Sequence, residues 1–262
     1  MPELLSGKTA LILGVANRWS LAYAIARAFK REGANLILTY QGERQKLTVE
    51  ELGAELGASQ VLACDVSQDS ELDNLAATLK DQKTVLNAVV HSIAFANRDD
   101  LNNPYLQTPR AGYALAQDVS SYSLVAVARA TAPLMAPKEE GGGSIMTLTF
   151  LGSVRVVQNY NVMGVAKAAL EAGVRYLASD LGPSNIRVNA ISAGVVKTAS
   201  ARAIKGLSKV LEATSIAPLR RNTDPAEVAD TAVFLASDLG RGVTGNIIYV
   251  DAGFQVMGLA SE

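Results

Sequence analysis

The sequence predicts a single α/β domain in which helices flank a doubly wound parallel sheet of about seven strands. Three observations predict this class. The chain has 262 residues, 49% of them hydrophobic, so it can bury one large core. Short runs rich in Val, Ile and Leu recur along it, as in strands that are buried on both faces. Helical patterns separate these runs, and strand-helix alternation implies right-handed crossovers with ligands bound beyond the carboxyl ends of the strands.

Seven apolar runs are predicted to be the strands. Each is short and is bounded by turn residues or by a helical pattern, as expected for a strand in the middle of an α/β sheet. In chain order the runs cover residues 9–15, 35–40, 60–66, 86–94, 144–150, 186–193 and 246–250.

Helical spacing predicts a helix over residues 21–32, ended by Gly33, and another over residues 70–80, opened by Ser70. Two segments fit the alternation badly. Residues 97–112 include Asn102, Asn103, Pro104 and Pro109, which predict a long loop over the sheet edge. Residues 194–218 carry apolar residues on one helical face, which suits an ordinary surface helix. Because a predicted strand precedes them, a lid over the substrate at about residues 195–218 is the alternative.

Composition excludes several classes of function. Lys and Arg total 24 against 25 Asp and Glu, so no overall field favours nucleic acid or an anionic membrane. The single cysteine, Cys64, and the single histidine, His91, cannot together form a zinc site, and we expect no metal. At the end of an apolar run, His91 favours a buried or cofactor-side histidine over a Ser-His-Asp triad. No run reaches the ~18 apolar residues of a membrane span, and we expect a cytoplasmic protein.

A dinucleotide site is expected where the first strand ends at Gly14 and a turn leads through Ser20 into the first helix. Backbone N–H groups and the helix dipole hold a pyrophosphate at this position. The turn has one glycine where the usual G-x-G-x-x-G pattern has three, so this signal is weak by itself. The alternative is that Ser20 is a simple helix cap.

The ends of the next two strands suggest the adenosine end of the cofactor. At the end of the second strand an NAD enzyme often carries a carboxylate and an NADP enzyme an arginine. Gln41 is neither, and no basic residue stands at positions 41–43, which favours NADH, although Arg44 leaves NADPH open. After the third strand, Asp65 offers an acceptor and Val66 an apolar contact for adenine. Alternatively, Asp65 is only a turn residue.

Tyr160 and Lys167 are the candidate catalytic pair. They stand seven residues apart in a helical pattern that runs to about Leu181, so both can share one helix face, roughly 10 Å apart along the axis. A tyrosine supplies a hydroxyl donor for a developing oxyanion, and a lysine can hold the nicotinamide ribose and keep the local potential positive. The alternative is a surface pair with no role in chemistry.

Together these segments resemble the enoyl-acyl-carrier-protein reductases, a divergent branch of the short-chain dehydrogenase/reductase superfamily with a Rossmann-type fold. The resemblance covers nearly the whole chain, and the combination is far more specific than any one part. Its marks are Gly14 with Ser20, Thr39-Tyr40-Gln41, Cys64-Asp65-Val66, His91-Ser92-Ile93-Ala94-Phe95-Ala96, residues 160–167 and residues 189–194.

The resemblance implies NADH-dependent reduction of trans-2-enoyl thioesters on acyl-carrier protein in fatty-acid elongation, in a homotetramer. Hydride would reach the β-carbon, and Tyr160 would bind the resulting enolate oxygen while Lys167 binds the nicotinamide ribose. Ala96 and Phe150 would line the substrate pocket. The residues lining the dinucleotide would be Gly14, Ser20, Leu21, Gln41, Asp65, Val66, Ile93, Lys167, Val196, Lys197, Thr198, Ala199 and Ser200.

The chain departs from the family at Phe150, where relatives often carry a second tyrosine, so Tyr160 must act alone. Residues 193–196 also lack the family's proline. Two alternatives stay open. A ketoreductase would carry Tyr-x-x-x-Lys, and no tyrosine here has a lysine four residues later. A non-catalytic dinucleotide-binding protein is compatible with the fold alone, but the presence of both Tyr160 and Lys167 argues against it.

Overall fold

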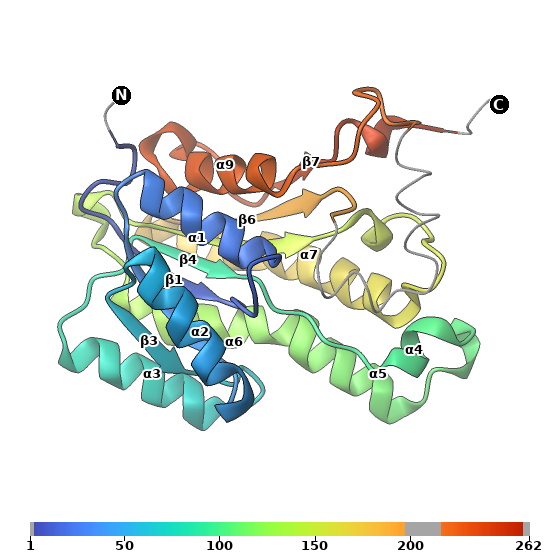
Figure 1. Cartoon of the computed structure of the whole chain (residues 1–262), viewed down its shortest axis with the longest axis horizontal. Helices are drawn as coiled ribbons and strands as arrows, with labels where there is room; N and C mark the ends of the chain where they lie inside the picture. The colour runs from blue at the N-terminus through green and yellow to red at the C-terminus, as the bar shows by residue number, and fades with distance from the viewer. Residues whose placement is uncertain (1–2, 197–215, 259–262) are drawn as a thin grey trace.

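The structure, a computed structural model, describes residues 3–196 and 216–258. It confirms the predicted fold class: seven parallel strands form one sheet in the order β3-β2-β1-β4-β5-β6-β7, with helices on both faces (Figure 1). The strand order reverses between β1 and β4, and the crevice beyond the carboxyl ends of strands at such a point is where ligands bind. The strands are β1 (Thr9–Leu13), β2 (Asn35–Tyr40), β3 (Gln60–Ala63), β4 (Ala88–His91), β5 (Gly143–Thr149), β6 (Ile186–Ala193) and β7 (Ile247–Val250).

Two helical layers cover the sheet. Helices α1, α2 and α9 pack on one face with Ile12 of β1, and α3, α6 and α7 pack on the other with Leu11 and Leu13. This alternation follows from the two-residue period of a strand. The helices are α1 (Leu21–Arg31), α2 (Glu43–Leu56), α3 (Asp69–Asp81), α4 (Arg98–Asn102), α5 (Arg110–Gln117), α6 (Ser123–Thr131), α7 (Asn161–Leu181) and α9 (Pro225–Ala236).

The helix predictions hold except at one cap. α1 starts after Ser20 and is followed by Gly33 at φ +83°, as predicted. The expected cap at Ser70 is wrong. α3 begins at Asp69 instead, and its capping residue Gln68 makes no side-chain bond to the helix. The physical reason is that the backbone carbonyl of Gln68 already accepts from the N–H of Glu71, which starts the helical ladder before Ser70 could cap it.

The predicted long loop over residues 97–112 is also wrong. This segment contains α4, a 3-10 turn over Tyr105–Gln107 and the start of α5. Pro104 and Pro109 stand immediately before helical segments, where a missing N–H costs no helical hydrogen bond. Both α4 and α5 pack against α7, beyond the end of β4 (Figure 1).

Residues 197–215 lie outside the described residues, and so does most of the predicted lid. Within the described ranges, no helix is both long and apolar enough to cross a membrane.

Candidate active site

The turn after β1 is built around Gly14 and Ser20. Gly14 has φ +97°, and a Cβ at this position would overlap the backbone carbonyl of Ser92, the residue after β4. Ser20 donates its hydroxyl proton to the carbonyl of Asn17 (2.8 Å) and accepts from the N–H of Tyr23 (3.2 Å). Ser20 is therefore a helix cap at the start of α1.

Gln41 and Asp65 come together at the ends of β2 and β3. Gln41 Nε2 donates to Asp65 Oδ2 (3.1 Å), while the N–H and hydroxyl of Ser67 donate to Oδ1 (3.0 and 2.8 Å). Burial acts to raise the pKa of Asp65, but these hydrogen bonds outweigh it and the pKa is lowered. Asp65 is thus both a turn residue and an ionised acceptor beside Gln41. Val66 is buried in the core layer against which Ile93 packs.

Lys167 is buried, with 5% of its surface exposed, and its Nζ donates to the backbone carbonyl of Leu148 on β5 (2.8 Å). Burial lowers the pKa of Lys167 to about 8, and the nearby carboxylate of Glu171 opposes this shift. The alternative of a surface pair is therefore wrong. Tyr160 stands at the residue that precedes α7, and burial, followed by the charge of Glu171, raises the pKa of its phenol. The phenol stays protonated at working pH.

The ring of Tyr160 is fixed by its neighbours. Phe150 follows β5 and meets it edge-on, with ring centroids 5.1 Å apart and planes at 72°. A Cβ at Gly152 would run into the same ring, and one at Gly164 would meet the carbonyl oxygen of Gly152 at 2.6 Å. Ala96 and Tyr160 border a small apolar cluster. Its buried members are Leu101, Ala116, Val162, Met163 and Ala166.

His91 is a satisfied core histidine, one of the two predicted roles. Its Nδ1 lies 2.9 Å from Thr147 Oγ1 and its Nε2 lies 2.8 Å from Ser123 Oγ. Burial, with a contribution from the charge of Lys167, lowers the pKa of His91 to about 3. Both ring nitrogens meet hydroxyls and no carboxylate bonds to the ring, so it belongs to no Ser-His-Asp triad. Among the described residues, no group of His, Cys, Asp and Glu side chains could hold a metal ion.

Sequence reasoning missed three polar residues of the site. Thr149, the last residue of β5, donates to the carboxylate of Glu171 (2.6 Å). Ser120, in a π-helical turn between α5 and α6, bonds both the N–H (2.8 Å) and the carbonyl (2.9 Å) of Phe95. The only signal in the sequence was the position of Glu171, four residues after Lys167, which places them on one helix face.

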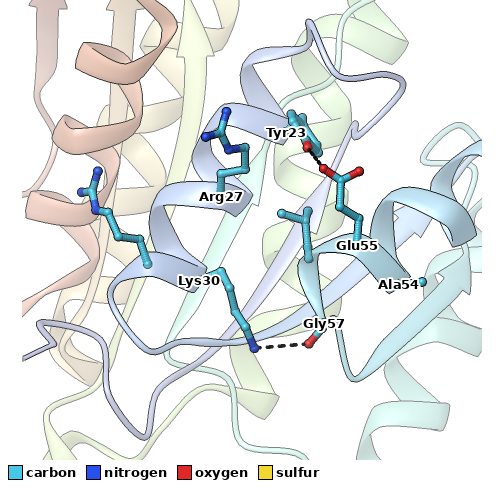
Figure 2. Close-up of a pocket in the computed structure, with 8 residues that line it drawn as sticks. Tyr23, Arg27, Lys30, Ala54, Glu55 and Gly57 are labelled. Carbon is cyan, nitrogen blue, oxygen red and sulfur yellow. Dashed lines mark hydrogen bonds between the residues drawn. The ribbon is translucent and has the colours of Figure 1, made fainter.

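Two surface hollows lie away from Tyr160 and Lys167, and one of them, between α1 and α9, reaches Ser20. One, of about 470 Å³, separates α1 from α2, and in it Tyr23 donates to Glu55 (2.7 Å) and Lys30 to the carbonyl of Gly57 (3.4 Å) (Figure 2). The other, of about 430 Å³, lies between α1 and α9. Neither is lined by Tyr160 or Lys167. We interpret both as gaps between packed helices, since their polar groups bond to one another.

A half-buried tyrosine and a buried ammonium group beside the crevice of a doubly wound sheet suit reduction with a bound dinucleotide. The fold and the site thus define a dinucleotide-dependent oxidoreductase. The family model described as enoyl-(acyl carrier protein) reductase matches residues 14–255. The chain belongs to this family, whose members are oxidoreductases that act on a carbon–carbon double bond, and the predicted resemblance is confirmed.

Close relatives agree over almost the full length. The NADH-dependent enoyl-[acyl-carrier-protein] reductase of Bacillus cereus is 52% identical and covers 98% of this chain and 100% of its own length. That of Bacillus subtilis is 49% identical, covering 96% and 97%. A solved structure of the Bacillus cereus enzyme with NADP+ and an indole naphthyridinone has a TM-score of 0.94 at 53% identity, covering 98% of this chain and 100% of that one. The ketoreductase alternative is set aside.

Proposed function

We propose that this chain reduces trans-2-enoyl thioesters of acyl-carrier protein with NADH, and that Tyr160 and Lys167 are the residues that act on the reacting groups. The observation that carries the proposal is that both lie at the end of β5, where Phe150 packs against the half-buried ring of Tyr160 and the carbonyl of Leu148 accepts from the buried ammonium group. Family membership supplies the class of reaction, and the geometry supports these roles.

When bound, the dinucleotide would supply the hydride that the β-carbon takes, and a proton from solvent at the α-carbon would complete the reduction. Tyr160 then donates its O–H to the enolate oxygen that develops at the thioester, and its raised pKa keeps the proton in place. Lys167 has a pKa of about 8, so it is largely charged at pH 7. One of its three N–H groups serves Leu148, which leaves two for the ribose hydroxyls. Its positive charge favours the enolate.

Several residues proposed for the dinucleotide follow the carboxyl ends of adjacent strands. Gly14 follows β1, Ser20 and Leu21 begin α1, and Gln41 and Asp65 follow β2 and β3. An ionised Asp65 would repel a 2′-phosphate, which supports NADH over NADPH. Three further residues are proposed to line the cofactor within the described ranges, namely Val66, Ile93 and Val196. The remaining four, Lys197, Thr198, Ala199 and Ser200, lie outside the described residues.

The apolar cluster beside Tyr160 is proposed to receive the acyl chain, with Ala96 and Phe150 at its border. A lid at about residues 195–218 would complete this pocket, in a chain that forms one domain over residues 1–262.

A homotetramer in the cytoplasm is the proposed working form. Support comes from apolar side chains exposed around α4 and α5, including Tyr105, Tyr113 and Leu106, which is 96% exposed. A second copy of the chain could cover them. Light scattering of the purified protein tests this, and a monomer at micromolar concentration would contradict it.

One assay tests the reaction and separates the alternatives. NADH oxidation is followed at 340 nm with a trans-2-enoyl thioester and, separately, with a 3-oxoacyl thioester of equal length. We expect turnover with the first and none with the second. Turnover with the 3-oxoacyl substrate alone would indicate a ketoreductase, and NADH binding without turnover of either would indicate a non-catalytic binding protein.

A further inference from the structure

Two consecutive residues at the end of β5 each form a hydrogen bond with a charged residue of α7. The backbone carbonyl of Leu148 accepts from Lys167 Nζ (2.8 Å), and the hydroxyl of Thr149 donates to Glu171 Oε1 (2.6 Å). The next residue, Phe150, lies just after the strand and makes the ring contact with Tyr160. The strand end thus sets the places of the phenol, the ammonium group and a carboxylate on one helix.

Glu171 has no part in the mechanism above, yet it is as buried as Lys167, with 6% of its surface exposed against 5%. A carboxylate taken out of water without a partner is costly. The two residues are four apart on α7, which makes them neighbours on one helix face. Their opposite charges therefore compensate each other in a place that is largely shielded from water.

The other titratable groups that interact with Lys167 in the described part of the chain carry no charge that could replace this carboxylate. His91 on β4 interacts electrostatically with Lys167, but its pKa of about 3 leaves it neutral. The phenol of Tyr160 is also neutral, because its pKa is raised. Among the residues that the structure describes, Glu171 is the anion that interacts electrostatically with Lys167, and it opposes the effect of burial on the lysine's pKa.

We propose that Glu171, held by Thr149, is a positioning residue that keeps Lys167 in its ammonium form and in place for the nicotinamide ribose. This inference rests on the proposed role of Lys167. Glu171 does not itself touch the cofactor or substrate in this scheme. Its effect is electrostatic, so it depends on the charge of the side chain and not on its volume.

Glu171→Gln separates charge from packing, because the amide oxygen still accepts from Thr149 while the negative charge is gone. The NADH dissociation constant is measured by fluorescence between pH 6 and pH 9.5. An opposite charge at this range shifts a pKa by about one unit or more, so the alkaline loss of binding should begin about one pH unit lower in the variant. With a one-unit shift from about 8, binding should weaken about fivefold at pH 8 and less than twofold at pH 6.

Matched variants exclude a general effect of charge or stability. Asp180→Asn removes a carboxylate from the exposed face of the same helix and should leave the pH profile unchanged. Thr149→Val should shift the profile in the same direction as Glu171→Gln, by a smaller amount, and Thr149→Ser should restore it. If Glu171→Gln does not fold, the two Thr149 variants carry the test.

The outcomes distinguish this inference from the function on which it rests. A Lys167→Ala variant that binds NADH as tightly as the parent, with the same pH profile, would refute the role of Lys167 itself. If the pH profile of NADH binding loses its alkaline limb in Lys167→Ala, while Glu171→Gln keeps the same midpoint as the parent, only the role of Glu171 would be refuted. Equal profiles for Thr149→Val and Thr149→Ser would overturn the part assigned to Thr149.

Discussion

Replacement of Tyr160 by phenylalanine removes one oxygen atom from a site that is otherwise fixed. The ring lies against Phe150 and leaves no room for a side chain at Gly152, so a phenylalanine ring should occupy the same place. The variant should therefore fold, with a free energy of unfolding within about 1 kcal/mol of the parent. Any large loss of activity can then be assigned to the missing O–H donor.

Loss of one preorganised donor to a developing oxyanion costs about 10²- to 10³-fold in kcat, or about 2.7–4 kcal/mol of transition-state stabilisation. We expect Tyr160→Phe to fall in this range, because the phenol is the only one that faces the apolar cluster in the described part of the chain. NADH binding should change less than twofold, since the proposed ribose contact belongs to Lys167. The alkaline limb near pH 8 should remain in the residual activity, because it reports Lys167 and not the phenol.

The assay is steady-state NADH oxidation at 340 nm with a saturating trans-2-enoyl thioester, combined with NADH titration by fluorescence. Tyr176→Phe is the matched control, because Tyr176 lies on the same helix and is 75% exposed. That control should keep full activity. A kcat for Tyr160→Phe within threefold of the parent would refute the assignment of the enolate donor.

Three other expectations concern the cofactor, the pocket and the core. The parent should prefer NADH. Gln41→Arg should reduce this preference by about tenfold in kcat/KM but not reverse it, because Asp65 lies within reach of the new guanidinium group. Equal efficiency with NADPH in the parent would show that another cation, such as Arg44, reaches the phosphate. Phe150→Tyr should change kcat/KM by less than about tenfold, and Phe150→Ala should lower kcat/KM through lost packing. A hundredfold gain from the hydroxyl added in Phe150→Tyr would mean that the natural enzyme is impaired. The folded-state pKa of His91, about 3, lies below its unfolded value of 6.5. The contribution of the neutral ring to stability is therefore fully present above pH 6.5, and below that pH the free energy of unfolding should fall by about 1.4 kcal/mol per pH unit. Measured by urea unfolding between pH 7 and pH 5, the free energy of unfolding should change less steeply with pH in His91→Gln than in the parent. Equal pH slopes would contradict the argument.

Much of the fold could be predicted because local pattern and tertiary structure agree. Six of the seven strands lie within the predicted apolar runs, and β5 begins one residue before its run. Helices α1 and α7 begin and end close to the predicted residues. The errors fall where tertiary contacts decide. Pro104 and Pro109 look like loop residues from the sequence, but each precedes a helical segment that α7 supports by packing. Ser70 suits a cap by residue type, yet backbone bonds start the helix before it.

The site was predicted in part for the same reason. Gln41 and Asp65 could be placed together because both follow neighbouring parallel strands. The buried state of Lys167 could not be derived from spacing, since a seven-residue separation is equally suited to a surface pair. The bond from Thr149 to Glu171 joins a strand to a helix 22 positions later in the chain. No local pattern specifies that register, which depends on how α7 lies on the sheet.

The close approach of Gly14 to Ser92 bears on how this turn could change over evolutionary time. The carbonyl of Ser92 leaves no room for a β-carbon at residue 14, whereas Ser20 holds the start of α1 through its own cap. The glycine requirement is thus concentrated at one position, where two adjacent strands end. A lineage could drift away from a glycine-rich turn at residues 15–19 and still keep a sheet that opens at the same crevice. Searches that demand three glycines would pass over such descendants, while the contact between two strand ends would still identify them.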